Sequence, residues 1–188
     1  MYRTAQFIAV LLLCTLAAAS AQVVQPLEAD EHTLLLYHFD GDGAQIVDSG
    51  PLGLDASVMT MEGEETVVVE DVQRTEGVSG TALMLPPAHA LVPESTPDEL
   101  RGMDQLTIEV WFRSAAEQPD NHQRIVRYWE HYLLSIFDSG NLMGHLYDDQ
   151  DATKYILRGD AIYPGRWYHA AITWDGERAR LWLNGKQI

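Results

Sequence analysis

The chain has 188 residues, 46% of them hydrophobic, and a formal net charge of −16 at pH 7. Nucleic acid and anionic membrane surfaces repel a protein of that charge, whereas export and divalent-cation binding are compatible with it. The length and hydrophobic content suffice for one domain with a sizeable core.

Residues 1–21 are predicted to be a secretory signal peptide. Arg3 precedes an apolar stretch from Phe7 to Leu16, and Ala19-Ser20-Ala21 has the small-x-small pattern of a cleavage site. The apolar stretch is too short to span a bilayer, and no second hydrophobic segment of about 18 residues follows it. Cys14 is the only cysteine, so no disulfide is expected after cleavage. We therefore expect a secreted, extracellular or periplasmic protein.

Residues 22–32 are expected to be a polar linker, and a single domain is expected over residues 33–188. The first predicted strand is Thr33–Phe39, an apolar and β-rich run. Turns are expected at residues 40–43 and 48–51, where aspartate and glycine cluster.

Short β-type runs continue along the rest of the chain. Strands are predicted at residues 54–61, 67–69, 81–85, 90–92, 106–113, 123–129, 132–137, 141–147 and 154–157. Ser95 or Thr96 can cap one helical turn that has Pro97 at its first position. Roughly ten to twelve strands at spacings of about 8–12 residues indicate an antiparallel sandwich.

The run Leu106–Arg113 shows the clearest period-2 pattern. One face carries Leu106, Ile108, Val110 and Phe112, and we expect it to point into the core. The other face carries Thr107, Glu109, Trp111 and Arg113, and we expect it to be exposed.

The C-terminal end predicts a hairpin. Trp167–Trp174 and Arg180–Leu183 are β-type runs, and Asp175-Gly176 between them supplies the positive-φ residue of a tight turn. Asn184-Gly185 is a second turn signal, so a third strand should begin near Gln187. Only the last two residues remain for it, so the sequence is expected to end inside a sheet.

Several spaced residues of this hairpin resemble one known family. They are Trp167, His169, Asp175-Gly176, Leu181, Trp182 and Asn184-Gly185-Lys186. The pattern resembles the laminin-G-like jelly-roll domain of the concanavalin A-like lectin/glucanase superfamily. The segments YHFDGDG and DSGPLG near the start, GVSGTALML in the middle and LTIEVWF at residues 106–112 resemble the same family.

This resemblance implies an all-β fold, a two-sheet antiparallel jelly-roll sandwich over residues 33–188 with its C-terminal strands missing. It also implies a binding role, and family members often bind calcium at a rim of the sandwich. A structural module of a larger multidomain extracellular protein is an alternative.

A catalytic site is not expected. Glycosidases of this fold group place two carboxylates on one strand, whereas Glu109 stands alone on its strand. The mature chain has no cysteine and no Gly-x-Ser-x-Gly elbow, and its histidines lack zinc-site spacing. A carbohydrate-active enzyme of the same fold remains the alternative function.

Calcium is the candidate cofactor, because hard cations take carboxylates from loops. Asp40, Asp42 and Asp48 surround the two N-terminal turns and are the predicted ligands. A second acidic loop holds Asp148, Asp149 and Asp151.

The predicted ligand-binding residues are Glu109, Trp111, Arg113 and Tyr147. Sugars are held by aromatic stacking together with planar polar side chains, and the exposed face of the Leu106–Arg113 strand has both types. Tyr147 and Trp182 are candidates to lie beside this row, although the order of the strands is not determined by the sequence. We therefore expect an exported, non-catalytic binding or adhesion module for a glycan or an extracellular protein.

Overall fold

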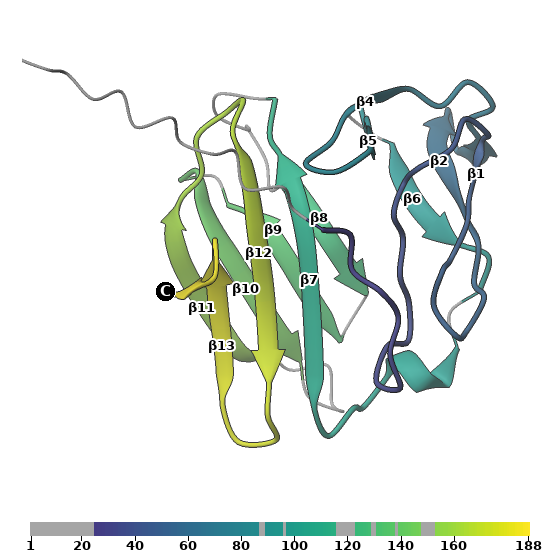
Figure 1. Cartoon of the computed structure of the whole chain (residues 1–188). Coiled ribbons are helices and arrows are strands. Elements are labelled where there is room, and N and C mark those ends of the chain that lie inside the picture. Colours follow the sequence, from purple (N-terminus) through teal and green to yellow (C-terminus); the bar gives the residue numbers. More distant parts are fainter. Residues whose placement is uncertain are drawn as a thin grey trace, which may run out of the picture.

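The computed structural model describes residues 25–86, 89–95, 97–115, 123–128, 131–137, 139–147 and 153–188. Within these ranges the chain forms fourteen β-strands and one short 3-10 turn, and the strand pairings are antiparallel (Figure 1). The predicted all-β class is confirmed. The described ranges hold no helix that is long and apolar enough to cross a membrane. The predicted signal peptide lies outside them.

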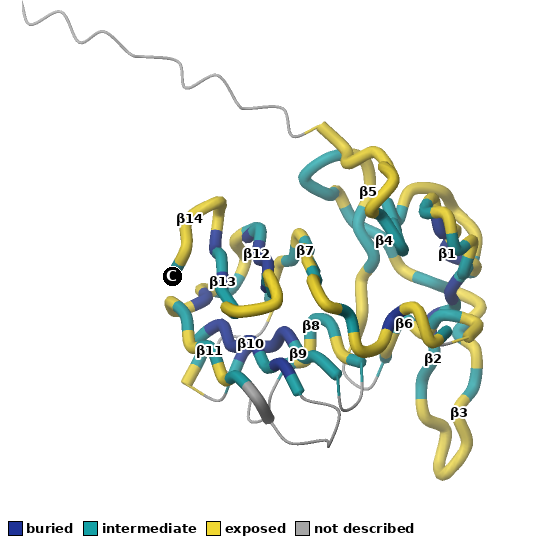
Figure 2. The backbone as a smooth tube through the Cα atoms, turned by 90° about the horizontal axis from the view of Figure 1, so that it is seen from below, coloured by how far each residue is buried: buried dark blue, intermediate teal, exposed yellow. Residues whose placement is uncertain are grey.

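Eight strands form two sheets that pack face to face (Figures 1 and 2). The front sheet has the order β14-β13-β12-β7, and its strands are Lys186–Gln187, Ala179–Leu183, Trp167–Trp174 and Leu106–Arg113. The back sheet has the order β11-β10-β9-β8, and its strands are Thr153–Ala161, Asn141–Tyr147, Tyr132–Ile136 and Gln123–Tyr128. This arrangement confirms the predicted two-sheet sandwich and agrees with a jelly-roll fold.

The main core lies between these two sheets. Ile172 and Leu181 of the front sheet and Leu134 and Leu142 of the back sheet are at most 1% exposed and belong to one hydrophobic cluster. Gly144 of β10 allows the close approach, because a Cβ atom there would lie 2.8 Å from Cδ1 of Ile172. Removing these side chains from water is the principal source of stability for the sandwich.

The alternation along β7 follows the predicted pattern. Leu106, Ile108, Val110 and Phe112 are partly buried and pack against the core cluster, whereas the four residues between them are exposed. Burial of one face therefore turns Glu109, Trp111 and Arg113 outward.

The N-terminal strands form separate, smaller sheets beside β7 (Figures 1 and 2). A four-stranded sheet contains β1, β2, β3 and β6, at Gln45–Ile46, Ala56–Glu62, Glu65–Val68 and Ala90–Pro93. A two-stranded sheet contains β4 and β5, at Arg74–Glu76 and Thr81–Leu83. Ile46, Ala56 and Val58 are at most 2% exposed and form the buried part of the larger of these sheets.

The prediction of a strand at Thr33–Phe39 is wrong. This segment makes a single antiparallel bridge, between Tyr37 and Asp48, and Phe39 has a positive φ of 62°. The N–H of Leu36 donates to Oδ1 of Asp48 at 2.8 Å, so a side chain satisfies a donor that a neighbouring strand would otherwise take. An apolar run is therefore held here as an irregular segment.

Other boundaries also differ from the predictions. The helical turn is Asp98–Leu100, with Pro97 at the cap position and no side-chain cap. Strand β11 extends four residues beyond the predicted end at Leu157, because its pairing with β10 continues to Ala161 past a register shift. The third strand expected near Gln187 is present as the two-residue β14, which pairs with Leu183 and Trp182.

The core supplies a matched test of stability. Ile172→Ala is expected to lower the free energy of unfolding by about 2–5 kcal/mol, since a fully buried side chain is removed and a cavity remains. Ile156→Ala changes the same residue type at a position that is 54% exposed, and should cost no more than about 0.5 kcal/mol. Urea unfolding of both variants measures the difference, and equal losses would contradict this description of the core.

Candidate functional site

The outer surface of the front sheet gathers aromatic and planar polar side chains from three strands. We call it the aromatic face, and it consists of Glu109, Trp111, Arg113, Trp167, His169 and Trp182. The antiparallel register places Trp111 opposite His169 and Arg113 opposite Trp167. Ala171 pairs with Glu109 on one side and with Trp182 on the other, so it links the two outer strands across the same surface.

The centre of the aromatic face is held by a three-residue contact. The rings of Trp111 and His169 lie 5.2 Å apart between centroids and are tilted by 47°. Nε2 of His169 lies 3.1 Å from Oε2 of Glu109, at hydrogen-bond distance. Trp111 remains 38% exposed, so its ring is fixed from one side and open to a ligand from the other.

The Asn184-Gly185 turn and the side chain of Arg113 also position residues of this surface. The N–H of His169 donates to Oδ1 of Asn184 at 3.0 Å, and the N–H of Asn184 donates back to the carbonyl of His169 at 2.7 Å. Asn184 has a φ of 51° and Gly185 a φ of 76°, which confirms the predicted turn. Where β7 ends and β12 begins, the guanidinium of Arg113 lies 5.0 Å from the centroid of the Trp167 ring, in cation–π geometry.

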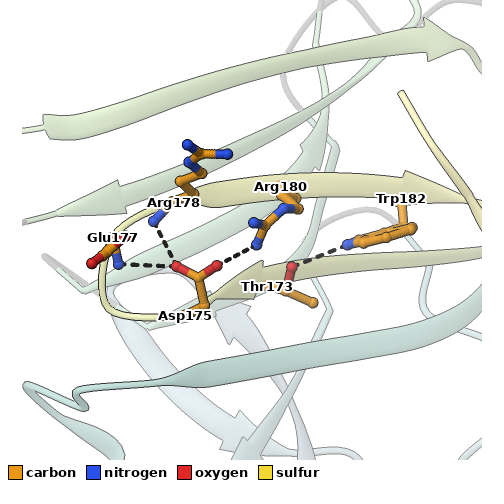
Figure 3. Close-up of polar contacts among 6 residues, drawn as sticks. All are labelled: Thr173, Asp175, Glu177, Arg178, Arg180 and Trp182. Carbon is orange, nitrogen blue, oxygen red and sulfur yellow. Dashed lines mark hydrogen bonds and ion pairs between the residues drawn. The ribbon is translucent and has the colours of Figure 1, made fainter.

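Hydrogen bonds hold the other end of the hairpin (Figure 3). Nε1 of Trp182 donates to Oγ1 of Thr173 at 3.0 Å, which fixes the indole across the strand pair. Oδ2 of Asp175 accepts from the Arg180 guanidinium at 2.6 Å, and its Oδ1 accepts from the N–H groups of Glu177 and Arg178. The bond from Arg180 and these two backbone bonds hold the pKa of Asp175 well below its usual range.

Three of the four predicted ligand-binding residues lie together on the aromatic face. Tyr147, a candidate to lie beside the β7 row, does not lie there, because it ends β10 in the back sheet. Trp182 does share the surface of that row. Trp167 and His169 were missed as site residues, although their alternate positions on one strand already placed them on a common face.

The comparisons agree with this architecture. A family model described as "Concanavalin A-like lectin/glucanases superfamily" matches residues 90–188, which include both sheets of the sandwich. The chain belongs to this superfamily. The resemblance seen in the C-terminal hairpin is thereby confirmed.

Among curated proteins, this laminin-G-like chain is similar to Pappalysin-1 of Mus musculus, with 26% identity over 148 residues. The match includes 66% of this chain and 9% of Pappalysin-1, so the chain spans a small part of that relative. No solved structure matches the chain.

The predicted calcium ligands of this laminin-G-like chain are not gathered into one group. Asp48 is 7% exposed, and its two oxygens accept N–H donors from Leu36, Gly50 and Leu54 at 2.7–2.9 Å. Oδ1 of Asp40 accepts the N–H of Thr81 at 2.9 Å, whereas Asp42 is exposed. Among the described residues, no set of three or more His, Cys, Asp or Glu side chains is arranged to hold a metal ion. The second acidic loop, at residues 148–151, lies outside the described residues.

Asp48 is therefore expected to organise the loop around residues 34–54. Asp48→Ala should remove the protection of the Leu36, Gly50 and Leu54 amides from hydrogen exchange, because their shared acceptor is lost. Asp42→Ala, in the same loop region but exposed, should leave that protection unchanged. Unchanged exchange at all three amides in Asp48→Ala would contradict the assignment.

The hairpin supplies a pH test. The Asp175 carboxyl should titrate well below the ordinary value of an aspartate, and Arg180→Gln should raise its pKa toward that value. Because the folded-state pKa is depressed, the pair stabilises the fold fully above about pH 4, and the contribution falls as pH drops toward the lowered pKa. Arg178→Gln is the control, since Arg178 contributes through its backbone N–H. Carboxyl carbon NMR measures each titration, and an equal shift in both variants would refute the role of the Arg180 side chain.

Proposed function

We infer that this chain is a non-catalytic binding or adhesion module of an exported protein, and that it recognises a glycan or another extracellular protein through the aromatic face. The observation that carries this inference is the set of three tryptophans interleaved with Glu109, Arg113 and His169 on one exposed sheet surface. Membership of the concanavalin A-like superfamily supports a binding role.

A glycan suits this surface for physical reasons. The apolar face of a sugar ring can stack on the exposed indole of Trp111, which buries apolar area without moving the ring. Glu109 supplies acceptors, and Arg113 supplies donors in a planar fork, so hydroxyl groups at the edge of the sugar can be paired. The contact of Glu109 with His169 holds the carboxylate in place before a ligand arrives.

A protein partner is the second candidate, favoured by the same composition. Tryptophan and arginine are the residues that dominate binding energy at protein interfaces, and here Arg113 stacks on Trp167 while Trp111 lies at the centre of the face. The similarity to a segment of Pappalysin-1 is compatible with a module inside a larger extracellular protein.

A carbohydrate-active enzyme has less support. Glycoside hydrolysis requires two carboxyl groups on either side of the scissile bond. On the aromatic face Glu109 is engaged by His169, and Asp175 lies at the far end of the hairpin with Arg180. A binding role requires no second carboxylate on this surface.

Export and calcium support remain proposals. Export is supported by the signal-peptide pattern of residues 1–21 and by the extracellular context of the family. Calcium at Asp40, Asp42 and Asp48 has no support from the geometry, since the Asp48 oxygens are already occupied by backbone donors. A higher Tm in the presence of calcium than in the presence of a chelator would support calcium binding, and equal Tm values would exclude it.

Trp111→Ala tests the function. A glycan array should show ligands of the wild-type chain, and the variant should bind them about tenfold or more weakly, because the stacking surface is lost. Tyr163→Ala is the control, since Tyr163 is an aromatic residue that is 58% exposed and lies outside the aromatic face. Glycan binding that survives Trp111→Ala unchanged would exclude this surface. If no glycan binds, a purified extracellular protein that binds the wild-type chain but not Trp111→Ala would support the protein alternative.

A further inference from the structure

The two sheets leave a hollow at one end of the sandwich. It has a volume of about 520 Å³ and lies where β7 and β9 begin and where β10 and β12 end. This volume falls within the range of roughly 300–1,000 Å³ that is typical of small-molecule sites. The aromatic face is on the outer surface of the front sheet, and its six residues do not line the hollow.

Aromatic rings form much of the wall. Tyr132, Tyr147, Tyr155 and Trp174 line it, and the last two rings lie 5.2 Å apart between centroids with a tilt of 42°. Tyr132 is partly buried, and the burial raises the pKa of its phenol to about 12. The faces of the tyrosine and tryptophan rings in this wall carry partial negative charge.

The charged side chains described in the lining of the hollow are acidic. Asp104 and Asp175 line it, whereas no lysine or arginine does so among the residues whose side chains the structure describes. Asp175 is paired with Arg180 at 2.6 Å. The nearby Arg101 is also engaged, with Asp98 at 3.3 Å and with the hydroxyl of Tyr128 at 2.6 Å.

Of the two lining aspartates, Asp104 is the one without a charged partner among the described residues. Within the part of the chain that the structure describes, it takes part in no salt bridge. It belongs to the segment between the 3-10 turn and β7, whose backbone approaches the β12–β13 turn: a Cβ at Gly176 would lie 3.4 Å from the carbonyl oxygen of Asp104. Asp104 thus lines the hollow and is itself exposed, so it belongs to the open side of this aromatic-lined space.

Electrostatics then restricts the class of ligand. An anion would be repelled by the carboxylate of Asp104, which lines the hollow. A neutral ligand in the hollow would leave the exposed carboxylate of Asp104 without a countercharge and would gain no Coulomb attraction from it. A cation supplies that charge and is also attracted to the faces of the tyrosine and tryptophan rings.

We propose that this hollow binds an organic cation, an ammonium or guanidinium group on an apolar stem, with the stem among Tyr132, Tyr155 and Trp174 and the charge at Asp104. The cation can be a free amine or the side chain of a lysine or arginine on a partner protein, since both present the same chemistry. This site is independent of the aromatic face and does not rest on the proposed function.

The test is a titration of the full chain, monitored by the backbone amides in proton–nitrogen NMR spectra. The probes are the blocked amino acid Nα-acetyl-lysine methylamide and its uncharged counterpart with norleucine. The lysine probe should cause saturable shifts at the amides of Gly102, Gln105 and Gly176, which line the hollow. The norleucine probe should bind at least about tenfold more weakly, because it lacks the charge.

Matched variants identify the groups responsible. Asp104→Asn should weaken binding of the lysine probe by about threefold to fivefold, as expected for an ion pair at an exposed carboxylate. Glu177→Gln, at an exposed carboxylate outside the lining, should not change it. Trp111→Ala should also leave it unchanged, which separates this site from the aromatic face. Asp104 is exposed, so its replacement should preserve the dispersed spectrum of the folded chain.

Equal affinity for the two probes, an Asp104→Asn variant that binds as the wild type does, or the absence of saturable shifts would each overturn the proposal. Butylamine and an acetylated Gly-Lys-Gly amide distinguish the sources of the cation. If butylamine binds as tightly as the Gly-Lys-Gly peptide, a free amine is sufficient as the ligand. Tighter binding of the peptide would indicate the side chain of a partner protein.

Discussion

Packing between the two sheets is the constraint on which the other features of the sandwich depend. Ile172 and Leu181 on one side and Leu134 and Leu142 on the other exclude water from the space between the layers. In a strand, consecutive side chains point to opposite faces, so each residue committed to this core sends its neighbours outward. The aromatic face is a consequence of that commitment, because Glu109, Trp111 and Arg113 occupy the outward positions of β7. A register slip of one residue would bury them and expose the aliphatic row.

The two ends of the chain differ strongly in charge. Residues 25–100 contain 16 acidic residues and one basic residue, Arg74, whereas residues 101–188 contain 12 acidic and 10 basic residues. The formal net charge is therefore −15 for the first part and −2 for the second part, which contains the sandwich. The negative formal net charge of the chain therefore comes mostly from residues 25–100. On the sandwich, local pairs such as Arg180 with Asp175 decide the field that a ligand meets.

Much of the sandwich could be predicted because its strands carry strong local signals. The alternation in Leu106–Arg113 and the turn residues at Asp175-Gly176 and Asn184-Gly185 specify strands and turns that need little information from elsewhere. The N-terminal part was less predictable. Strands β1 and β4 have two and three residues, too few for a periodic pattern, and the apolar run at Thr33–Phe39 is diverted from strand pairing by the Asp48 carboxylate.

The sequence alone determined that this chain is an all-β protein of the concanavalin A-like type, and that Glu109, Trp111 and Arg113 share an exposed row. The all-β class and the exposed row follow from period-2 alternation and from turn residues, which act within a few residues of each other. The concanavalin A-like type follows from the resemblance of several spaced motifs to that family. Only the tertiary structure decided which strands lie side by side. Pairing of β12 with β7 brought His169 against Trp111 and Glu109, and assignment of β10 to the other sheet separated Tyr147 from them. Neighbours across a sheet are selected by the packing of the whole core, and no local pattern in a strand specifies its partner.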